Sequence, residues 1–111
     1  MIDAGKLRHR VSLQEQQTAR NPETGDVIKQ WVELGKLWAS IEPLSAREFI
    51  SAAAEQSKIV ARIVTRHNPL VTSRMRFVHR GKAYNIEGVL ADRDSGLEYQ
   101  THPVSEGVND G

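Results

Sequence analysis

The 111-residue chain contains no cysteine, so it can form neither a disulfide framework nor a thiolate metal site. It also has no apolar run of the ~18 residues that a membrane-spanning helix requires. Its first ten residues include several charged ones and lack the apolar core of a signal peptide. We therefore expect a soluble, cytosolic protein whose stability comes from packing or from partners.

Motifs for catalysis are missing as well. The sequence has no P-loop, no dinucleotide-binding glycine pattern and no Gly-x-Ser-x-Gly nucleophile turn. Asp92 and Asp94 stand in a predicted turn, where bonds to their own backbone explain them better than a cation site does. The four histidines are far apart and lack metal-ligand spacing, so we interpret all of them as structural. They are His9, His67, His79 and His102. We expect no enzymatic activity, no cofactor and no metal.

Short segments with the period-two alternation of half-buried strands make up most of the chain. The expected strands are residues 7–17, 27–34, 37–42, 58–66, 74–79, 82–90 and 97–101. Gly35 is expected to connect the second and third, and Arg80-Gly81 to make a hairpin turn. Trp31, Trp38 and Ile41 are the predicted core anchors. The pattern predicts a mainly β fold, a small antiparallel barrel or sandwich of six to seven strands, in one domain over residues 1–102 with a polar tail over residues 103–111.

A helical insertion is expected over residues 45–56. Pro43 ends the preceding strand, and Ser45 and Glu48 have the spacing of a capping box at a helix start. Phe49, Ala52, Ala53 and Gln56 then fall on one face, which is narrow and made mostly of small side chains. A helix of about eleven residues is marginal alone, so we expect contacts within or between molecules to hold it.

Charge is unevenly distributed although the net charge is only +1. Residues 58–82 carry seven basic residues and no acid, whereas residues 83–111 carry a net charge of −5. The basic block is a solvated strand face, a nucleic-acid surface, or a partner for the acidic block of another copy in a ring. The candidate interface residues, expected on the outer face, are Arg62, Arg66, Arg74, Arg76 and Arg80.

Several motifs occur together in a fixed order. They are Leu7-Arg-His-Arg-Val11, Pro22-Glu-Thr-Gly25 followed by Trp31, Trp38-Ala-Ser-Ile-Glu-Pro-Leu-Ser-Ala-Arg-Glu48, Arg76-Phe-Val and Tyr84-Asn-Ile86. In this order and spacing, from about Gly5 to His102, the chain resembles the head-tail joining proteins of long-tailed bacteriophages, also called head-closure or stopper proteins.

The resemblance implies a small β-barrel that docks as a homo-oligomeric ring beneath the phage portal and its adaptor, closes the DNA-filled head and presents a platform for the tail. The implied partners are the portal and adaptor complex, a tail-completion or tail-tube protein and further copies of the chain, close to packaged DNA and without a membrane. The implied location is the virion connector, assembled in the bacterial cytoplasm. The resemblance also points the helical insertion toward the channel. The residues concerned are Ser45, Glu48, Phe49, Ala52 and Ala53.

The alternative hypothesis is an OB-like barrel that binds single-stranded nucleic acid through the same five arginines. Such binding needs aromatic side chains between the basic ones, because bases stack on aromatic rings. Only Phe77 lies near the arginines in sequence, and it is expected on the opposite face. The chain has just two phenylalanines and two tyrosines, which counts against this alternative.

Overall fold

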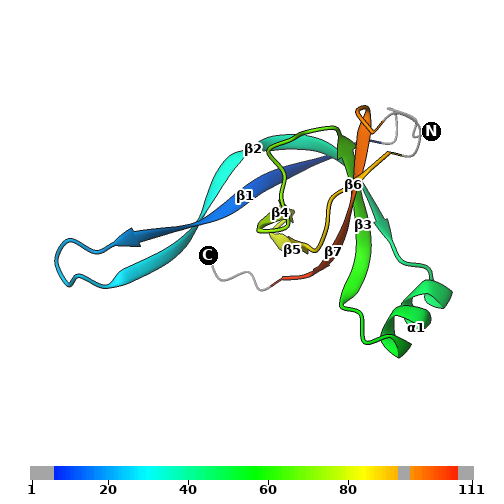
Figure 1. The fold of residues 1–111 in the computed structure, drawn as a ribbon, viewed down its shortest axis with the longest axis horizontal. Coiled ribbons are helices and arrows are strands. Elements are labelled where there is room, and N and C mark those ends of the chain that lie inside the picture. The colour runs from blue at the N-terminus through cyan, green and yellow to red at the C-terminus, as the bar shows by residue number, and fades with distance from the viewer. Residues whose placement is uncertain (1–6, 93–95, 108–111) are drawn as a thin grey trace.

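The strands form a sheet that closes on itself (Figure 1). The computed structural model describes residues 7–92 and 96–107. Within them lie seven strands and one helix: β1 (His9–Arg20), β2 (Val27–Pro43), α1 (Ala46–Ala54), β3 (Ile59–Arg66), β4 (Met75–His79), β5 (Lys82–Ile86), β6 (Leu90–Ala91) and β7 (Tyr99–Glu106). The strand order is β3-β2-β1-β4-β5-β7-β6, and β3 also pairs with β7. All pairings are antiparallel, which confirms the predicted mainly β, barrel-like fold with a helical insertion.

Strand β2 is longer than the sequence pattern suggested. The two strands predicted on either side of Gly35 are one strand of 17 residues, paired with β1 from Val27 to Ala39. Gly35 opposes Leu13 and Glu33 opposes Gln14, so Leu34 is an extra residue on β2. This is a β-bulge, which bends a strand without ending it. The prediction of a tight connection at Gly35 was therefore wrong.

The core lies inside the closed sheet. All of its members except Val71, which lies between β3 and β4, are strand residues, mostly alternate ones, which is how a pleated strand presents one face. The buried cluster consists of Val11, Leu13, Ala39, Ala61, Ile63, Val71, Phe77, Ile86 and Val104. Of the three predicted core anchors, Ile41 packs partly buried against the core, whereas Trp31 is only half-buried and Trp38 is 53% exposed. Trp38 lies between Leu37 and Ala39, so strand alternation points it outward.

The turn between β4 and β5 has the predicted form. His79 pairs directly with Lys82, which leaves a two-residue loop. Both loop residues have positive φ, 52° for Arg80 and 80° for Gly81. This is the geometry of a type I′ turn, which matches the twist of the two strands it joins. The following strand ends at Ile86, earlier than predicted, and pairing resumes at β6.

Strand β7 continues beyond the predicted end of the domain. The strand expected over residues 97–101 reaches Glu106, and Val104 and Ser105 are buried in it. β3 and β5 both pair with this part of β7, so it closes the sheet. The predicted polar tail therefore begins too early, because residues 103–106 belong to the barrel. Residues 108–111 lie outside the described part of the chain.

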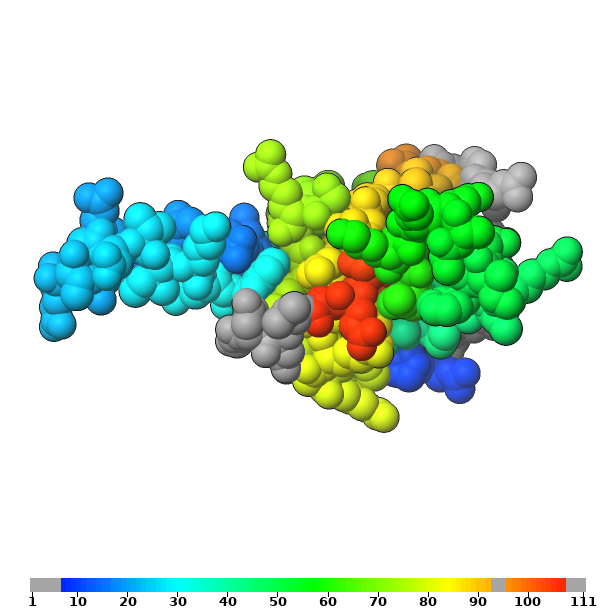
Figure 2. All heavy atoms as spheres, turned by 90° about the horizontal axis from the view of Figure 1, so that it is seen from below, coloured from blue at the N-terminus to red at the C-terminus, as the bar shows by residue number. Residues whose placement is uncertain are grey.

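The β1–β2 hairpin projects far from the barrel (Figures 1 and 2). β1 pairs with β4 only as far as Glu15, and beyond that point the two strands form a ribbon of their own. We call residues 17–30 the arm; none of them is buried. The molecule measures 52 × 32 × 23 Å with a radius of gyration of 15.5 Å. A compact domain of this length has a radius of gyration of about 13 Å, so the arm reaches beyond a globular outline.

Candidate interaction surfaces

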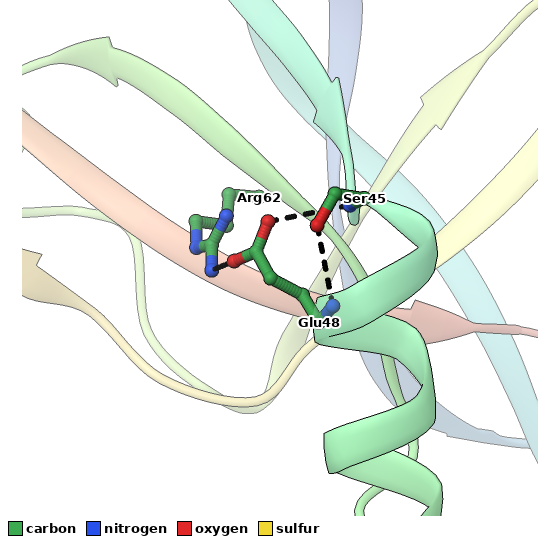
Figure 3. A network of polar contacts seen from close by, with 3 residues as sticks. All are labelled: Ser45, Glu48 and Arg62. Carbon is green, nitrogen blue, oxygen red and sulfur yellow. Dashed lines mark hydrogen bonds and ion pairs between the residues drawn. The ribbon is translucent and has the colours of Figure 1, made fainter.

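The start of α1 has the predicted capping box (Figure 3). The backbone N–H of Glu48 donates to Ser45 Oγ at 3.2 Å, and the backbone N–H of Ser45 donates to Glu48 Oε1 at 3.2 Å. Two N–H groups that the first helical turn leaves without backbone acceptors are thus satisfied by side chains. The helix begins at the residue after Ser45, where the sequence placed it.

An ion pair ties the cap to the barrel. The Arg62 guanidinium on β3 donates to Glu48 Oε2, the carboxylate oxygen that the capping box does not use (Figure 3). The hydrogen bond from Arg62, followed by the one from the Ser45 backbone, lowers the pKa of Glu48 to about 2. The same hydrogen bond raises the pKa of Arg62. Both partners are partly exposed, so the pair is a local tether rather than a large source of stability.

The helix itself buries no side chain. Phe49 is 55% exposed and Ile50 is 68% exposed. Of the residues predicted to share a face with Phe49, Ala52 is half-buried and Ala53 is exposed. A shallow hollow of about 440 Å³ separates the helix from β3. The segment is thus ordered by its cap and the ion pair while its apolar side chains remain available.

The five candidate arginines do not gather on one face. Arg66, Arg74 and Arg80 are exposed, Arg62 is half-buried beside Glu48, and Arg76 is buried. Arg74 and Arg80 flank opposite ends of β4. The expectation that all five are exposed on the outer face is therefore wrong for Arg76, and whether the other four form an interface stays a prediction.

Arg76 in particular was expected on the outer surface. It is only 3% exposed, because the ring of Trp31 covers its guanidinium and the Gln14 side chain accepts from its Nε at 2.8 Å. Gln14 pairs directly with Arg76 across β1 and β4, so the two side chains share a face. The alternation along the strand correctly predicted that Arg76 and Phe77 point to opposite faces. It gave no sign that Trp31 of the β1–β2 hairpin covers the Arg76 side chain.

A second group of charged and aromatic residues assembles at the other end of the β1–β2 hairpin. Arg10 stacks over the Trp38 ring at 5.1 Å, and Arg66 lies 5.8 Å from the Tyr99 ring. Arg8, Trp38 and Arg66 line one shallow hollow of about 410 Å³, together with Leu7. We call Arg8, Arg10, Trp38, Arg66 and Tyr99 the cationic–aromatic patch. Sequence analysis missed it because its members come from four strands or their approaches.

Three of the histidines, His9, His79 and His102, make contacts that fit the predicted structural role. His102 is completely buried, with Nδ1 2.8 Å from the Ile63 carbonyl and Nε2 3.0 Å from Gln100 Nε2. This geometry fits the neutral ring, with Nδ1–H donating to the carbonyl and Nε2 accepting from the amide. Burial lowers the pKa of His102, although the carbonyl contact partly opposes the shift. His9 and His79 form an edge-to-face pair.

No group of three potential metal ligands occurs among residues 7–92 and 96–107. Asp92 accepts hydrogen bonds from the backbone N–H groups of Glu98 and Tyr99, which is a loop-closing role. Asp94 lies outside the described residues. In the part of the chain that the structure describes, no helix is both long and apolar enough to cross a membrane.

A family comparison decides the class of protein. The model of the phage head completion protein family matches residues 2–107. The chain belongs to this family. It is therefore a structural protein of the phage particle and not an enzyme, and it works through contacts with other phage proteins. Its relation to phage head proteins, expected from the motifs between Leu7 and Ile86, is confirmed.

Solved structures show the same fold for this head completion protein. The solution structure of protein SF1141 from Shigella flexneri 2a is 27% identical, with a TM-score of 0.75, and the match covers 96% of this chain and 98% of that one. A chain in the virion of a native gene transfer agent particle is 18% identical, with a TM-score of 0.57 and coverage of 91% and 96%. The second likeness shows the fold alone. A search of curated proteins finds no significant match.

Proposed function

We propose that this head completion protein forms a ring between the portal and adaptor complex and the tail, where it closes the DNA-filled head and provides the site of tail attachment. The observation that carries the proposal is that two elements leave the closed barrel without burying side chains in it. They are the arm, residues 17–30, and the helix α1. Elements of this kind are marginally stable alone, so we expect contacts with other molecules to stabilise them further.

The helix is the element that we assign to the channel. Its N-terminus is fixed by Ser45 and Glu48, while Phe49 and Ala53 are exposed and Ala52 is only half-buried. A segment held at one end can change position when copies assemble around an axis. In the proposed ring, α1 and its flanking turns point inward and narrow the path of the DNA.

The test is electron microscopy of particles made with and without the protein. With it, a ring should join the portal and adaptor, and heads should keep their DNA and bear tails. Without it, packaging should proceed but heads should lose DNA and remain tailless. If particles that lack the protein retain their genomes and infect cells, or if the purified protein never joins portal and adaptor, the proposal is wrong.

A further inference from the structure

The composition of the cationic–aromatic patch is typical of a protein-binding surface. Arg, Trp and Tyr are the residues most enriched at energetic centres of interfaces, and the patch consists entirely of these three. Trp38 lies exposed with a guanidinium stacked on it, and Arg8, Arg10 and Arg66 are exposed. Unpaired carboxylates on a partner are the natural ligands of such guanidinium groups.

The rest of the molecule favours a protein ligand over nucleic acid. A nucleic-acid surface usually belongs to a strongly basic domain, whereas this chain has a net charge of +1 and a pI of about 8.1. The exposed acid Glu98 directly precedes Tyr99 of the patch. Within the patch, the positive charge comes from three arginines only. A group of this size suits the recognition of a few carboxylates at short range.

The arm presents matching chemistry. Its turn, residues 21–26, contains Glu23 and Asp26 and no basic residue, and all of these positions except Asn21 are exposed. Val27 and Ile28 directly follow the turn and are also exposed. A two-stranded ribbon without tertiary packing is marginally stable at best, so an acidic tip beside apolar side chains is expected to have a binding partner.

The arm cannot reach the patch of its own chain. Both surfaces belong to the same hairpin: Arg10 pairs with Trp38 at one end, and Arg20 pairs with Val27 at the other. Ten residue steps along β1 separate these pairs, which is about 33 Å of extended strand. Figures 1 and 2 show the hairpin leaving the barrel without folding back. Contact between tip and patch therefore requires two molecules.

We propose that the arm tip of one copy docks on the cationic–aromatic patch of the next, so that Glu23 and Asp26 pair with Arg8, Arg10 or Arg66 and Val27 packs on Trp38. The inference rests on the proposed ring and specifies which surfaces meet in it. Because tip and patch are different surfaces, the contact is head-to-tail, and such contacts generate closed rings when the rotation between copies allows.

Cross-linking tests the contact directly, because the chain has no cysteine of its own. A chain carrying Thr24→Cys and Glu98→Cys, the second at an exposed position beside the patch, is assembled on portal and adaptor. It is checked for rings by electron microscopy and treated with a short bis-maleimide. The double variant should give a ladder of covalent oligomers. Each single variant should give no species larger than a dimer. Rings without a ladder overturn the inference and leave the proposed function intact, whereas the absence of rings with the unmodified protein refutes the proposed function itself.

Charge exchange gives an independent test. Either Glu23→Arg with Asp26→Arg, or Arg8→Glu with Arg10→Glu, should lower the assembled fraction by roughly tenfold or more, since like charges then face each other. Combining all four changes in one chain should restore assembly. The matched control is Arg74→Glu with Arg80→Glu, two exposed arginines outside the patch, which should leave assembly unchanged.

Two results would overturn the inference. In the first, the combined variant fails to restore assembly although circular dichroism shows that it is folded, which would mean that arm and patch have different partners. In the second, reversing Arg8 and Arg10 leaves rings intact but abolishes salt-dependent binding of a short single-stranded oligonucleotide, which would identify the patch as a nucleic-acid site.

Discussion

The guanidinium carbon of Arg76 lies 4.2 Å from the centroid of the Trp31 ring. The contact joins β4 to the base of the arm, because Trp31 directly follows residues 17–30 and pairs with Gln16. Gln14 holds the same guanidinium from the side. The charge is thus stacked and hydrogen-bonded outside the apolar core, which is how a buried arginine is tolerated. This contact packs the base of the arm against β4.

Arg76→Ala is expected to lower the free energy of unfolding by about 2 to 4 kcal/mol, because the stacking, the packing of the side-chain stem and the hydrogen bond to Gln14 Oε1 are lost. Urea denaturation followed by Trp31 and Trp38 fluorescence measures it. The control is Arg74→Ala, an exposed arginine two residues away, which should change stability by about 0.5 kcal/mol or less. Equal effects of the two substitutions would show that Arg76 is solvated in solution.

The pKa of Glu48 predicts how α1 responds to acid. This pKa is lowered from 4.5 to about 2 in the folded protein, so the unfolded helix segment binds the proton more readily. The contribution of the ion pair to the stability of α1 is therefore complete above pH 4.5 and is lost as the pH falls toward 2. An NMR titration of the Glu48 carboxyl group and the Ser45 amide should show this midpoint.

Arg62→Gln provides the control for that titration. The capping box does not involve Arg62, so Ser45 and Glu48 should keep their mutual bonds while the midpoint of Glu48 rises toward its ordinary value of 4.5. Amide hydrogen exchange in α1 should become faster, with little change in the barrel, because the helix buries no side chain. A midpoint near 4.5 in the unmodified protein would contradict the ion pair.

Burial of His102 makes the barrel sensitive to mild acid. The folded state lowers the pKa of this histidine below 6.5, so the unfolded chain binds more protons near that pH. The contribution of the buried, neutral His102 to the free energy of unfolding is then complete above pH 6.5 and decreases as the pH falls below it. A second proton on the ring would also face the Gln100 amide, which now donates to Nε2.

To test this, the free energy of unfolding is measured at one pH unit above and one pH unit below 6.5. The difference between the two should be smaller in His102→Gln than in the unmodified protein. His67→Gln, at an exposed position, should retain the full difference. The pKa of His79 is also lowered, chiefly by burial, and contributes with the same sign in all three proteins. An unchanged pH dependence in His102→Gln would contradict the assignment.

Substitution by alanine should affect the free energy of unfolding differently at Gly81 and at Gly35. Gly81 has a φ of 80° in the type I′ turn, and an added Cβ disfavours this backbone conformation by about 1 to 2 kcal/mol. Gly35 has an ordinary φ and open space around a built Cβ. We expect Gly81→Ala to lower the free energy of unfolding and Gly35→Ala to leave it unchanged or raise it slightly. Similar losses at both positions would mean that the bulge at Leu34 also requires glycine.

Features set by neighbouring residues were predictable from the sequence. The cap at Ser45 and Glu48 follows from the chemistry of a helix start, and the turn at Arg80 and Gly81 follows from the twist of a hairpin. Each depends on a few consecutive residues, so no knowledge of the remaining chain was required. The helical insertion and the β4–β5 hairpin were placed correctly for this reason.

Features set by distant residues were not predictable. Trp38, predicted as a core anchor, is a different case, because its alternation with Leu37 and Ala39 already indicates that it points outward. No such signal existed for Arg76, because its burial depends on Trp31, 45 positions earlier in the chain. The extra residues of β7 were missed for a similar reason, since pairing with β3 and β5 orders a segment that is polar in sequence.

Removing the arm should separate folding from assembly. Gln16 and Trp31 are directly paired, so replacing residues 17–30 by Asn-Gly joins the strands through a two-residue type I′ turn in the same register. No side chain in the deleted segment is buried, and the stacking of Trp31 on Arg76 is retained. The shortened protein should unfold cooperatively at nearly the original temperature but fail to form rings on portal and adaptor. Rings of unchanged stability would show that the arm has no part in assembly, and loss of the folded barrel would show that it is required for folding.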